Sequence, residues 1–210
     1  MQHSLDLSDI AKANANVHIL EIDLKKYDAY DKLSKQVHDI VGEDGLNVLF
    51  NNAGVASKFT RLNLVKPEQL QDAFATNTIA PIMLSKALYP VLKKAATNNV
   101  DVPMGVRRAA IVNMSSILGS ITANTDGGYY PYRCSKAALN MATKSLSVDL
   151  KADGILVTAL HPGWVKTDMG GTRAPLEVST SAGDIVHLLY TLTEHHNGAY
   201  VQHDGKPLHW

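Results

Sequence analysis

The sequence predicts an α/β fold in which a parallel β-sheet is covered by helices on both faces, and three observations support this. Apolar, β-branched runs typical of buried strands alternate with longer runs typical of helices. No repeat, low-complexity tract or linker divides residues 1–210, so a single domain is expected. Polar residues follow several strand-like runs, at the edge where ligands of such sheets bind. The strand-like runs are residues 17–22, 46–50, 109–114, 155–160 and 198–201.

The predicted helices occupy the stretches between these runs. Pro67 suits the first turn of a helix, whereas Pro90 is expected to break the same helix. The polar segment 97–108, which contains Pro103 and Gly105, is expected to be a loop. The predicted helices are residues 28–41, 67–96, 131–152 and 179–195.

Charge and composition argue against several classes of protein. Twenty basic residues balance twenty acidic ones, so nothing favours a nucleic-acid partner. No apolar run approaches the roughly 20 residues of a membrane helix. The single cysteine, Cys134, excludes an internal disulfide, fits a cytoplasmic protein and is interpreted as a small packing residue. The spacing of the nine histidines matches no zinc motif, so no metal site is predicted.

The most informative pattern is a tyrosine followed four residues later by a lysine. Tyr132 and Lys136 lie downstream of a strand-like run that ends in Ser115 and Ser116. In a helix this spacing puts the phenol and the ammonium on one face. A phenol with a pKa of about 10 is a poor acid or base at neutral pH, but a neighbouring cation lowers that pKa. Tyr132 is therefore a candidate general acid/base, although a Tyr-Lys pair alone is most often a solvated helix face.

Further motifs accompany this pair along the chain. Asn51-Asn52-Ala53-Gly54 follows a strand-like run, Asn77 lies in a predicted helix, and Pro162-Gly163-Trp164-Val165-Lys166-Thr167 follows another strand-like run. In this order, the motifs resemble those of the short-chain dehydrogenase/reductase family over nearly the whole chain. The stretch 123–128 and the ending 204–210 look most like the sniffer-type carbonyl reductases, close to the C-factor-like group.

The resemblance implies an oxidoreductase that reduces a carbonyl with hydride from NADP(H), with NAD as a possible substitute. It implies that Tyr132 supplies the proton and that Ser116 stabilises the developing alkoxide. It also implies that Lys136 lowers the pKa of the tyrosine and holds the nicotinamide ribose, and that Asn77 anchors a proton-relay water. The competing interpretations are a serine pair that ends a strand and a buried amide that kinks a helix.

The same resemblance implies further contacts with the cofactor. Asp23 would meet the adenine ring, although a helix N-cap is an equal alternative. Val165 would meet the nicotinamide carboxamide and Thr167 the pyrophosphate, and the segment 168–175 would form a mobile lid over the substrate. The implied contacts that follow strand-like runs are Asn51, Ala53, Gly54, Pro162, Gly163, Val165 and Thr167, and Tyr132 and Lys136 complete the set.

One family feature is expected to be absent. The family begins with a strand, a glycine-rich turn and a helix, yet no glycine precedes Gly42 and the resemblance begins at Val17. The missing turn would present N–H groups to the pyrophosphate, so its loss would impair cofactor binding. The strand at 17–22 would then pair directly with the strand at 46–50, or the edge of the latter would stay unpaired. The residues before Val17 fit the tail of a helix better than a signal peptide.

Two functions therefore stay open. One is an NADP-linked carbonyl reductase, and the other is a truncated, catalytically impaired relative that acts only as an interaction partner or reflects an incomplete gene model. The resemblance implies a dimer or tetramer through helices 67–96 and 131–152. Tyr129 and Tyr130 are candidate pocket or packing aromatics. The substrate is not named by the sequence, because pocket residues vary freely on one scaffold.

Overall fold

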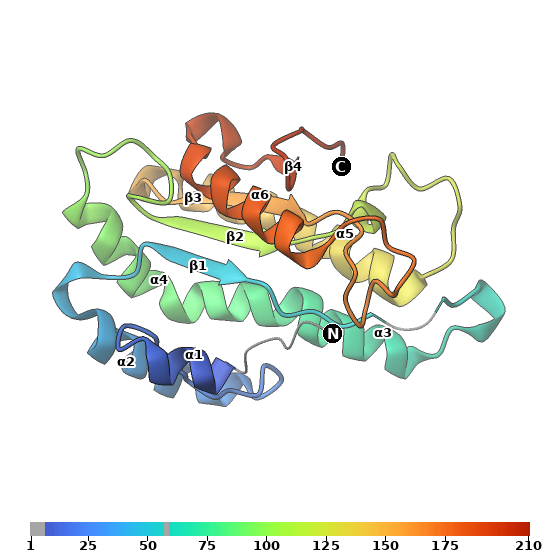
Figure 1. Ribbon diagram of the computed structural model, residues 1–210, viewed down its shortest axis with the longest axis horizontal. Coiled ribbons are helices and arrows are strands. Elements are labelled where there is room, and N and C mark those ends of the chain that lie inside the picture. The colour runs from blue at the N-terminus through green and yellow to red at the C-terminus, as the bar shows by residue number, and fades with distance from the viewer. Residues whose placement is uncertain (1–6, 57–58) are drawn as a thin grey trace.

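The computed structural model describes residues 7–56 and 59–210, and in it four parallel strands form one sheet in the order β1-β2-β3-β4 (Figure 1). The strands are β1 (Val48–Asn51), β2 (Ala110–Met114), β3 (Leu156–His161) and β4 (Tyr200–Gln202). The α-helices are α1 (Leu7–Ala13), α2 (Tyr30–Val41), α3 (Pro67–Phe74), α4 (Ala80–Asn98), α5 (Tyr130–Asp149) and α6 (Val178–Thr191). A π-helical turn at Ala75–Ile79 joins α3 to α4. The predicted parallel α/β fold is confirmed.

The central strands are buried on both faces, as parallel strands between helix layers require. All six residues of β3 are buried. Successive residues in and just before β2 alternate between two apolar clusters: Ala109 and Ile111 pack with residues of α4, whereas Ala110 and Val112 pack with residues of α6. Figure 1 shows α6 in front of the sheet and α4 behind it. The sheet is therefore the middle layer of three.

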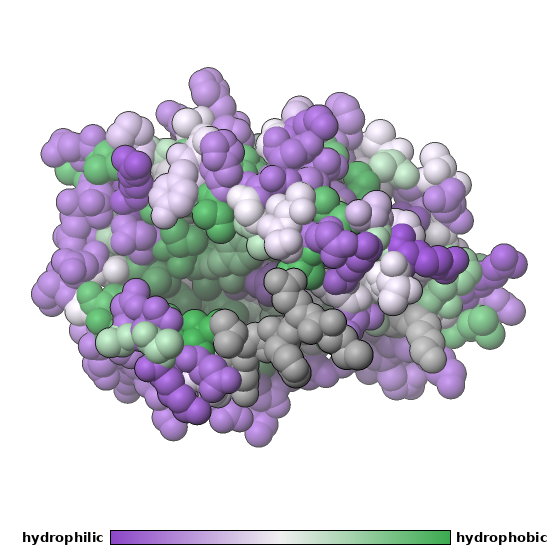
Figure 2. All heavy atoms as spheres, viewed as in Figure 1, coloured by the Kyte–Doolittle hydropathy of each residue, from purple (hydrophilic) through white to green (hydrophobic). Residues whose placement is uncertain are grey.

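The predicted strand at residues 17–22 is wrong. The segment is irregular, and β1 pairs with β2 on one side only within the described part of the chain. An extended segment needs a neighbour to satisfy its backbone groups, so apolar and β-branched residues alone do not make a strand. Of the two arrangements considered for this edge, the structure shows the unpaired one. Apolar side chains gather in a hollow over the sheet between α1 and α6 (Figure 2).

The predicted break at Pro90 is also wrong, because α4 runs through it from Ala80 to Asn98. Proline removes the hydrogen bond to the carbonyl four residues earlier, which belongs to Lys86. Both Pro90 and Lys86 are exposed, so water can satisfy that carbonyl, while Leu92 on the opposite face is fully buried. The irregularity lies instead at the π-helical turn between α3 and α4.

Other predictions have simple outcomes. Helix α1 confirms a helix before Val17, and the segment between α4 and β2 contains no strand or helix, as predicted. Cys134 is exposed, which contradicts its interpretation as a packing residue. The reason is its place on α5, because it projects away from the face that buries Ser135 and Lys136. Within residues 7–56 and 59–210, no helix is both long and apolar enough to cross a membrane.

Candidate active site

The candidate site residues lie at one edge of the sheet, because the strands are parallel and the residues follow their carboxyl ends. Asn51 ends β1, Ser115 and Ser116 follow β2, and Pro162 follows β3. Asn51 lies opposite Asn113 in the register of the two strands, and its amide donates to Oδ1 of Asn113 over 2.8 Å. This buried amide pair fixes the ends of β1 and β2 relative to each other.

Helix α5 supplies the tyrosine and the lysine. Tyr129 precedes the helix in a left-handed conformation at φ 49°, and Pro131 occupies the first turn. Lys136 is buried, with Nζ 5.7 Å from the centroid of the Tyr132 ring and 2.7 Å from the carbonyl oxygen of Met114. The lysine therefore reaches from α5 back to the last residue of β2 and lies over the face of the phenol.

The pKa values differ from the sequence expectation. Burial raises the pKa of Tyr132 above its ordinary value, and a hydrogen bond with the Ser116 side chain lowers it only in part. Lys136 is not among the groups that shift it. Burial lowers the pKa of Lys136 itself to about 8. The expected lowering of the tyrosine pKa by the lysine is thus wrong for this structure, because the ammonium donates to the Met114 carbonyl and lies over the ring.

Ser116 begins the turn that follows β2. It precedes the 3-10 helix η5 (Ile117–Gly119), and its Oγ accepts a hydrogen bond from the backbone N–H of Leu118 over 3.3 Å. The same side chain lies close enough to the phenol of Tyr132 to lower its pKa in part. The structure therefore brings together the serine hydroxyl and the phenol, as carbonyl polarisation by two donors would require.

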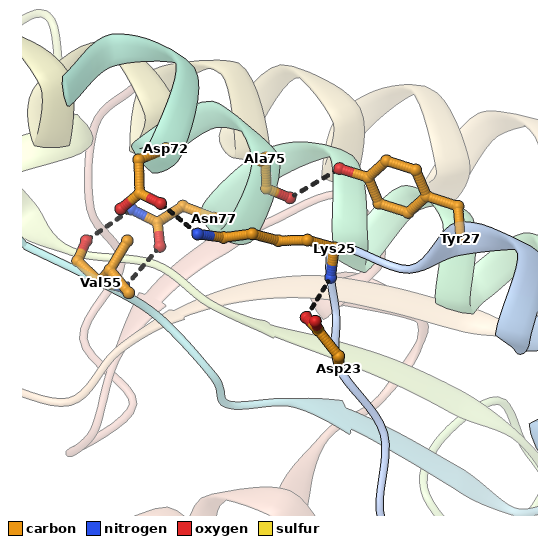
Figure 3. Close-up of polar contacts among 7 residues, drawn as sticks. All are labelled: Asp23, Lys25, Tyr27, Val55, Asp72, Ala75 and Asn77. Carbon is orange, nitrogen blue, oxygen red and sulfur yellow. Dashed lines mark hydrogen bonds and ion pairs between the residues drawn. The ribbon is translucent and has the colours of Figure 1, made fainter. Parts of the chain in front are cut away.

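Asn77 lies in the π-helical turn between α3 and α4 and is fully buried. Its Oδ1 accepts from the backbone N–H of Val55, and its Nδ2 donates to the Val55 carbonyl and to Oγ of Ser135, all within 2.8–2.9 Å. Figure 3 shows the paired contacts between Asn77 and Val55. Such π-turns are often found at functional sites. Here the turn aims one amide at both the loop after β1 and helix α5.

Gly54 marks the point where these elements converge. A Cβ atom placed on it would lie 3.4 Å from both Oδ1 of Asn77 and Nζ of Lys136. Glycine at this position keeps the space between the loop after β1 and the lysine free of a side chain. Ala53 and Asn52, beside it, are exposed at the same edge.

Asp23 lies in the irregular segment that precedes α2. Its carboxylate accepts from the backbone N–H of Lys25 over 3.0 Å, and the ammonium of Lys25 pairs with Asp72 on α3 (Figure 3). The phenol of Tyr27 donates to the carbonyl of Ala75 over 3.5 Å. These contacts hold the segment against α3 and the π-helical turn. Asp23 caps a local turn rather than α2, and its contact with adenine stays a prediction.

The turn after β3 is held by its neighbours. Gly163 has φ +84°, and the Pro162 carbonyl accepts from Oγ of Ser181 on α6 over 2.7 Å. Oγ1 of Thr167 accepts from the backbone N–H of Gly170 over 3.0 Å. Thr167 is exposed at the carboxyl edge of the sheet, so the predicted pyrophosphate contact remains sterically accessible.

A hydrogen bond and a β-bridge hold the loop that follows this turn. The indole N–H of Trp164 donates to the Gly170 carbonyl over 2.8 Å, and Val165 forms an isolated bridge with Leu176. The segment expected to be a lid is therefore a closed loop in the structure. The contact of Val165 with the nicotinamide carboxamide stays a prediction.

Sequence reasoning missed a buried polar network beneath the site. The amide of Asn113 donates to Oγ1 of Thr143 over 2.9 Å, which links the asparagine pair of β1 and β2 to α5. A second pair joins Ser115 to Asn140. Asn140 and Thr143 lie four and seven residues after Lys136, so helical spacing places all three on one face. That spacing, together with an asparagine inside an apolar strand, was the available signal.

Phe59 and Tyr129 form the aromatic contact nearest the start of α5. Their ring centroids are 4.8 Å apart at an angle of 78°. Gly128, at φ +65°, lies against the Phe59 ring, which leaves no room for a Cβ atom. Tyr129 is thus a packing aromatic in this structure, whereas Tyr130 is partly exposed.

A three-layer parallel α/β fold with a Ser-Tyr-Lys cluster at the carboxyl edge defines a dehydrogenase/reductase of the short-chain class. The chain belongs to the short chain dehydrogenase family, which it matches over residues 6–177. It is 38% identical over 165 residues to the C-signal of Myxococcus xanthus, an alignment that covers 79% of this chain and 93% of that protein.

Two solved structures are similar over almost the whole chain. The carbonyl reductase Sniffer of D. melanogaster is 59% identical with a TM-score of 0.96, covering 97% of this chain and 82% of that one. The NADPH-bound carbonyl reductase from chicken fatty liver is 37% identical with a TM-score of 0.91, covering 97% of this chain and 81% of that one. The resemblance to sniffer-type carbonyl reductases is confirmed.

Proposed function

We propose that this protein reduces a carbonyl compound to an alcohol with hydride from NADPH. The observation that carries the proposal is the convergence of the Ser116 hydroxyl, the Tyr132 phenol and the buried Lys136 ammonium at one edge of the sheet. Similarity to an NADPH-bound carbonyl reductase supports NADP over NAD. NAD remains an outcome that the binding test separates.

The residues present fit the nicotinamide end of such a cofactor. A Cβ atom on Gly54 would enter the space bordered by Asn77 and Lys136, and a close backbone approach of this kind suits a ribose and the flat nicotinamide ring. Lys136 would hold the ribose hydroxyls, and the loop of Pro162, Gly163 and Val165 would face the carboxamide. When bound, NADPH supplies the hydride.

The protein's own groups would place and protonate the substrate. Ser116 and Tyr132 would both donate to the carbonyl oxygen, where negative charge develops. The phenol, which its raised pKa keeps protonated at neutral pH, would then transfer its proton to that oxygen, because the alkoxide formed there is more basic than the phenolate. Lys136, whose own pKa is about 8, would return a proton from solvent to the phenolate.

Asn77 would serve this proton relay indirectly, by holding the loop after β1 in place. Its two amide hydrogens and Oδ1 already bond to Val55 and Ser135. We therefore assign to its side chain the placement of the loop after β1 beside Lys136. A relay water would bind to another group of this turn.

The proposal also includes assembly and location. We propose a dimer through α4 and α5, because Met141 and Val148 are large apolar side chains exposed on α5. A cytoplasmic location is proposed with it. Size-exclusion chromatography with light scattering tests the assembly, and a monomer at micromolar concentration would contradict it.

Titration with NADPH, followed by nicotinamide fluorescence, tests the function. Saturable micromolar binding that is lost in Lys136→Ala, followed by turnover that is lost in Tyr132→Phe, supports the reductase. Tighter binding of NADH than of NADPH would overturn the choice of cofactor. A folded chain that binds neither would favour the impaired relative as the better description.

A further inference from the structure

The segment that carries Ser116 is held from two sides. We call residues 115–122, which follow β2, the serine segment. Its first residue is tied to the sheet, because the backbone N–H of Ser115 donates to the Leu160 carbonyl over 2.7 Å. At its other end Ile121 is 78% exposed, so this end has few apolar contacts to hold it.

Helix α5 holds the serine segment from one side through Asn140. Oγ of Ser115 donates to Oδ1 of Asn140 over 2.5 Å, and Nδ2 of Asn140 donates to the Gly119 carbonyl over 3.3 Å. Ser115 and Asn140 are both buried. One side chain thus bonds on both sides of Ser116.

The last residues of the chain hold the segment from the other side. Oγ of Ser120 donates to the His209 carbonyl over 2.7 Å, and the backbone N–H of Thr122 donates to the Trp210 carbonyl over 3.0 Å. These contacts join positions almost ninety residues apart, so the entropic cost of closing them is borne elsewhere in the fold. Trp210 itself is stacked on the ring of Tyr200, with centroids 5.2 Å apart at 18°.

Tyr200 connects the two sides. It is the first residue of β4 and is 2% exposed, and its carbonyl accepts from the backbone N–H of Leu208 over 2.8 Å. Burial raises its pKa, the side chains of Ser115 and Asn140 beside its hydroxyl lower it in part, and the charge of Tyr132 raises it further. The Tyr200 hydroxyl is buried without a hydrogen-bond partner in the described chain, near the Ser115 and Asn140 side chains that act on its pKa.

We infer that Tyr200 and Trp210 are positioning residues that hold the serine segment, and with it Ser116, in register with Tyr132. The Tyr200 ring stacks on Trp210, whose carbonyl accepts from the backbone N–H of Thr122, and Tyr200 itself is buried in β4. Neither residue touches the reacting atoms in this assignment. The inference rests on the proposed function only for its effect on turnover, since the contacts themselves do not depend on it.

Amide hydrogen exchange tests the contacts without any need for turnover. In Trp210→Ala, the Thr122 amide should exchange about fivefold faster or more, as expected for the loss of one hydrogen bond and its support. Trp210→Phe, which keeps a ring on Tyr200, should restore most of the protection. Trp164→Ala, the change at the other tryptophan, should leave Thr122 unchanged. Equal exchange at Thr122 in wild type and Trp210→Ala would overturn the inference.

Turnover of 4-nitrobenzaldehyde with NADPH tests the consequence. Trp210→Ala should lower kcat about tenfold while the KM for NADPH changes less than twofold, since misplacement of one donor affects the transition state and not cofactor binding. Tyr200→Phe keeps the ring stacked on Trp210 and removes only a hydroxyl without a hydrogen-bond partner in the described chain, so it should leave kcat close to the wild-type value. An unchanged kcat in Trp210→Ala would overturn the positioning role. If the wild type shows no turnover, the proposed function fails. Amide exchange at Thr122 still decides whether His209 and Trp210 hold the serine segment.

Discussion

The ammonium of Lys136 donates to the carbonyl of Met114 over 2.7 Å, so a charge on α5 is held against the end of β2. No counter-ion shifts the pKa of this lysine, and burial alone lowers it from 10.5 to about 8. A carbonyl stabilises an ammonium less than a carboxylate does, so the lysine pKa lies close to neutral pH although the charged form still predominates at pH 7. This balance suits a group that passes protons near neutral pH.

Lys136→Met should stabilise the folded protein at pH 7. The lowered pKa means that the folded state keeps the charge at a cost on the order of 3 kcal/mol. Between pH 8 and 10.5 the unfolded chain binds more protons than the folded one, so wild-type stability rises with pH across this window. Urea unfolding at pH 7, 8.5 and 10 should show the advantage of the variant shrinking. The exposed Lys144→Met should show no such trend, and a constant advantage for Lys136→Met would contradict this account.

His161→Gln should remove part of the acid sensitivity of the fold. His161 ends β3 with its Nδ1 buried and without a hydrogen bond in the described chain, and burial, with the charge of His203, lowers its pKa to about 4. Between pH 6.5 and 4 the unfolded chain binds a proton that the folded chain refuses, so stability falls as the pH falls. Thermal unfolding at pH 7, 5.5 and 4.5 should show a shallower decline for the variant. The exposed His195→Gln serves as the control, and equal slopes in wild type and His161→Gln would refute the assignment.

Asn77→Ala should destabilise the protein by about 2–3 kcal/mol. The substitution removes three hydrogen bonds of a fully buried side chain and leaves the half-buried Val55 N–H and carbonyl without this partner, while the Ser135 hydroxyl keeps its bond to the Tyr132 carbonyl. Asn98→Ala, at the exposed end of α4, should cost at most about 1 kcal/mol. Chemical denaturation of both variants measures the difference. Equal losses would mean that the π-helical turn is held by other contacts.

Gly119→Ala should destabilise the turn that carries Ser116. Its Cβ would lie 2.8 Å from Cβ of Lys136 and 2.9 Å from the backbone carbon of that residue, so the serine segment would have to move away from α5. A cost of about 1–3 kcal/mol is expected. Gly183→Ala, within α6 and with no neighbouring atom within 4 Å, should stabilise by about 0.5–1 kcal/mol. Calorimetry should therefore shift the two melting temperatures in opposite directions.

The local pattern predicted most of the framework. The runs at 46–50, 109–114, 155–160 and 198–201 correspond to β1 to β4 within two residues at each end, because buried parallel strands need continuous apolar residues. The same pattern failed at 17–22, where the residues are suited to a strand but no strand lies beside them in the described chain. Strand formation depends on a partner that local sequence does not report.

The sequence predicted which residues make up the candidate site better than it predicted their pKa values. The spacing of Tyr132 and Lys136 placed both on one helix, and the structure brings Ser116, Asn77 and Gly54 to them. The tyrosine pKa was predicted to be lowered by Lys136, whereas burial raises it and the lysine, which donates to Met114, contributes no shift. Burial and the direction of one ammonium decide this outcome, and neither is visible in the spacing of residues.

The sequence by itself determined the α/β class, the four strands of the sheet and the identity of the Ser-Tyr-Lys cluster. The strands follow from local periodicity, whereas the assignment of Ser116 to the cluster came from the resemblance to the short-chain dehydrogenase/reductase family. Only the tertiary structure decided that the edge of β1 is unpaired, that α4 continues through Pro90, and that Tyr200 and Trp210 lie behind the serine segment. Each of these depends on groups distant in the chain or on the solvent that reaches them, because burial and pairing are set by the whole fold.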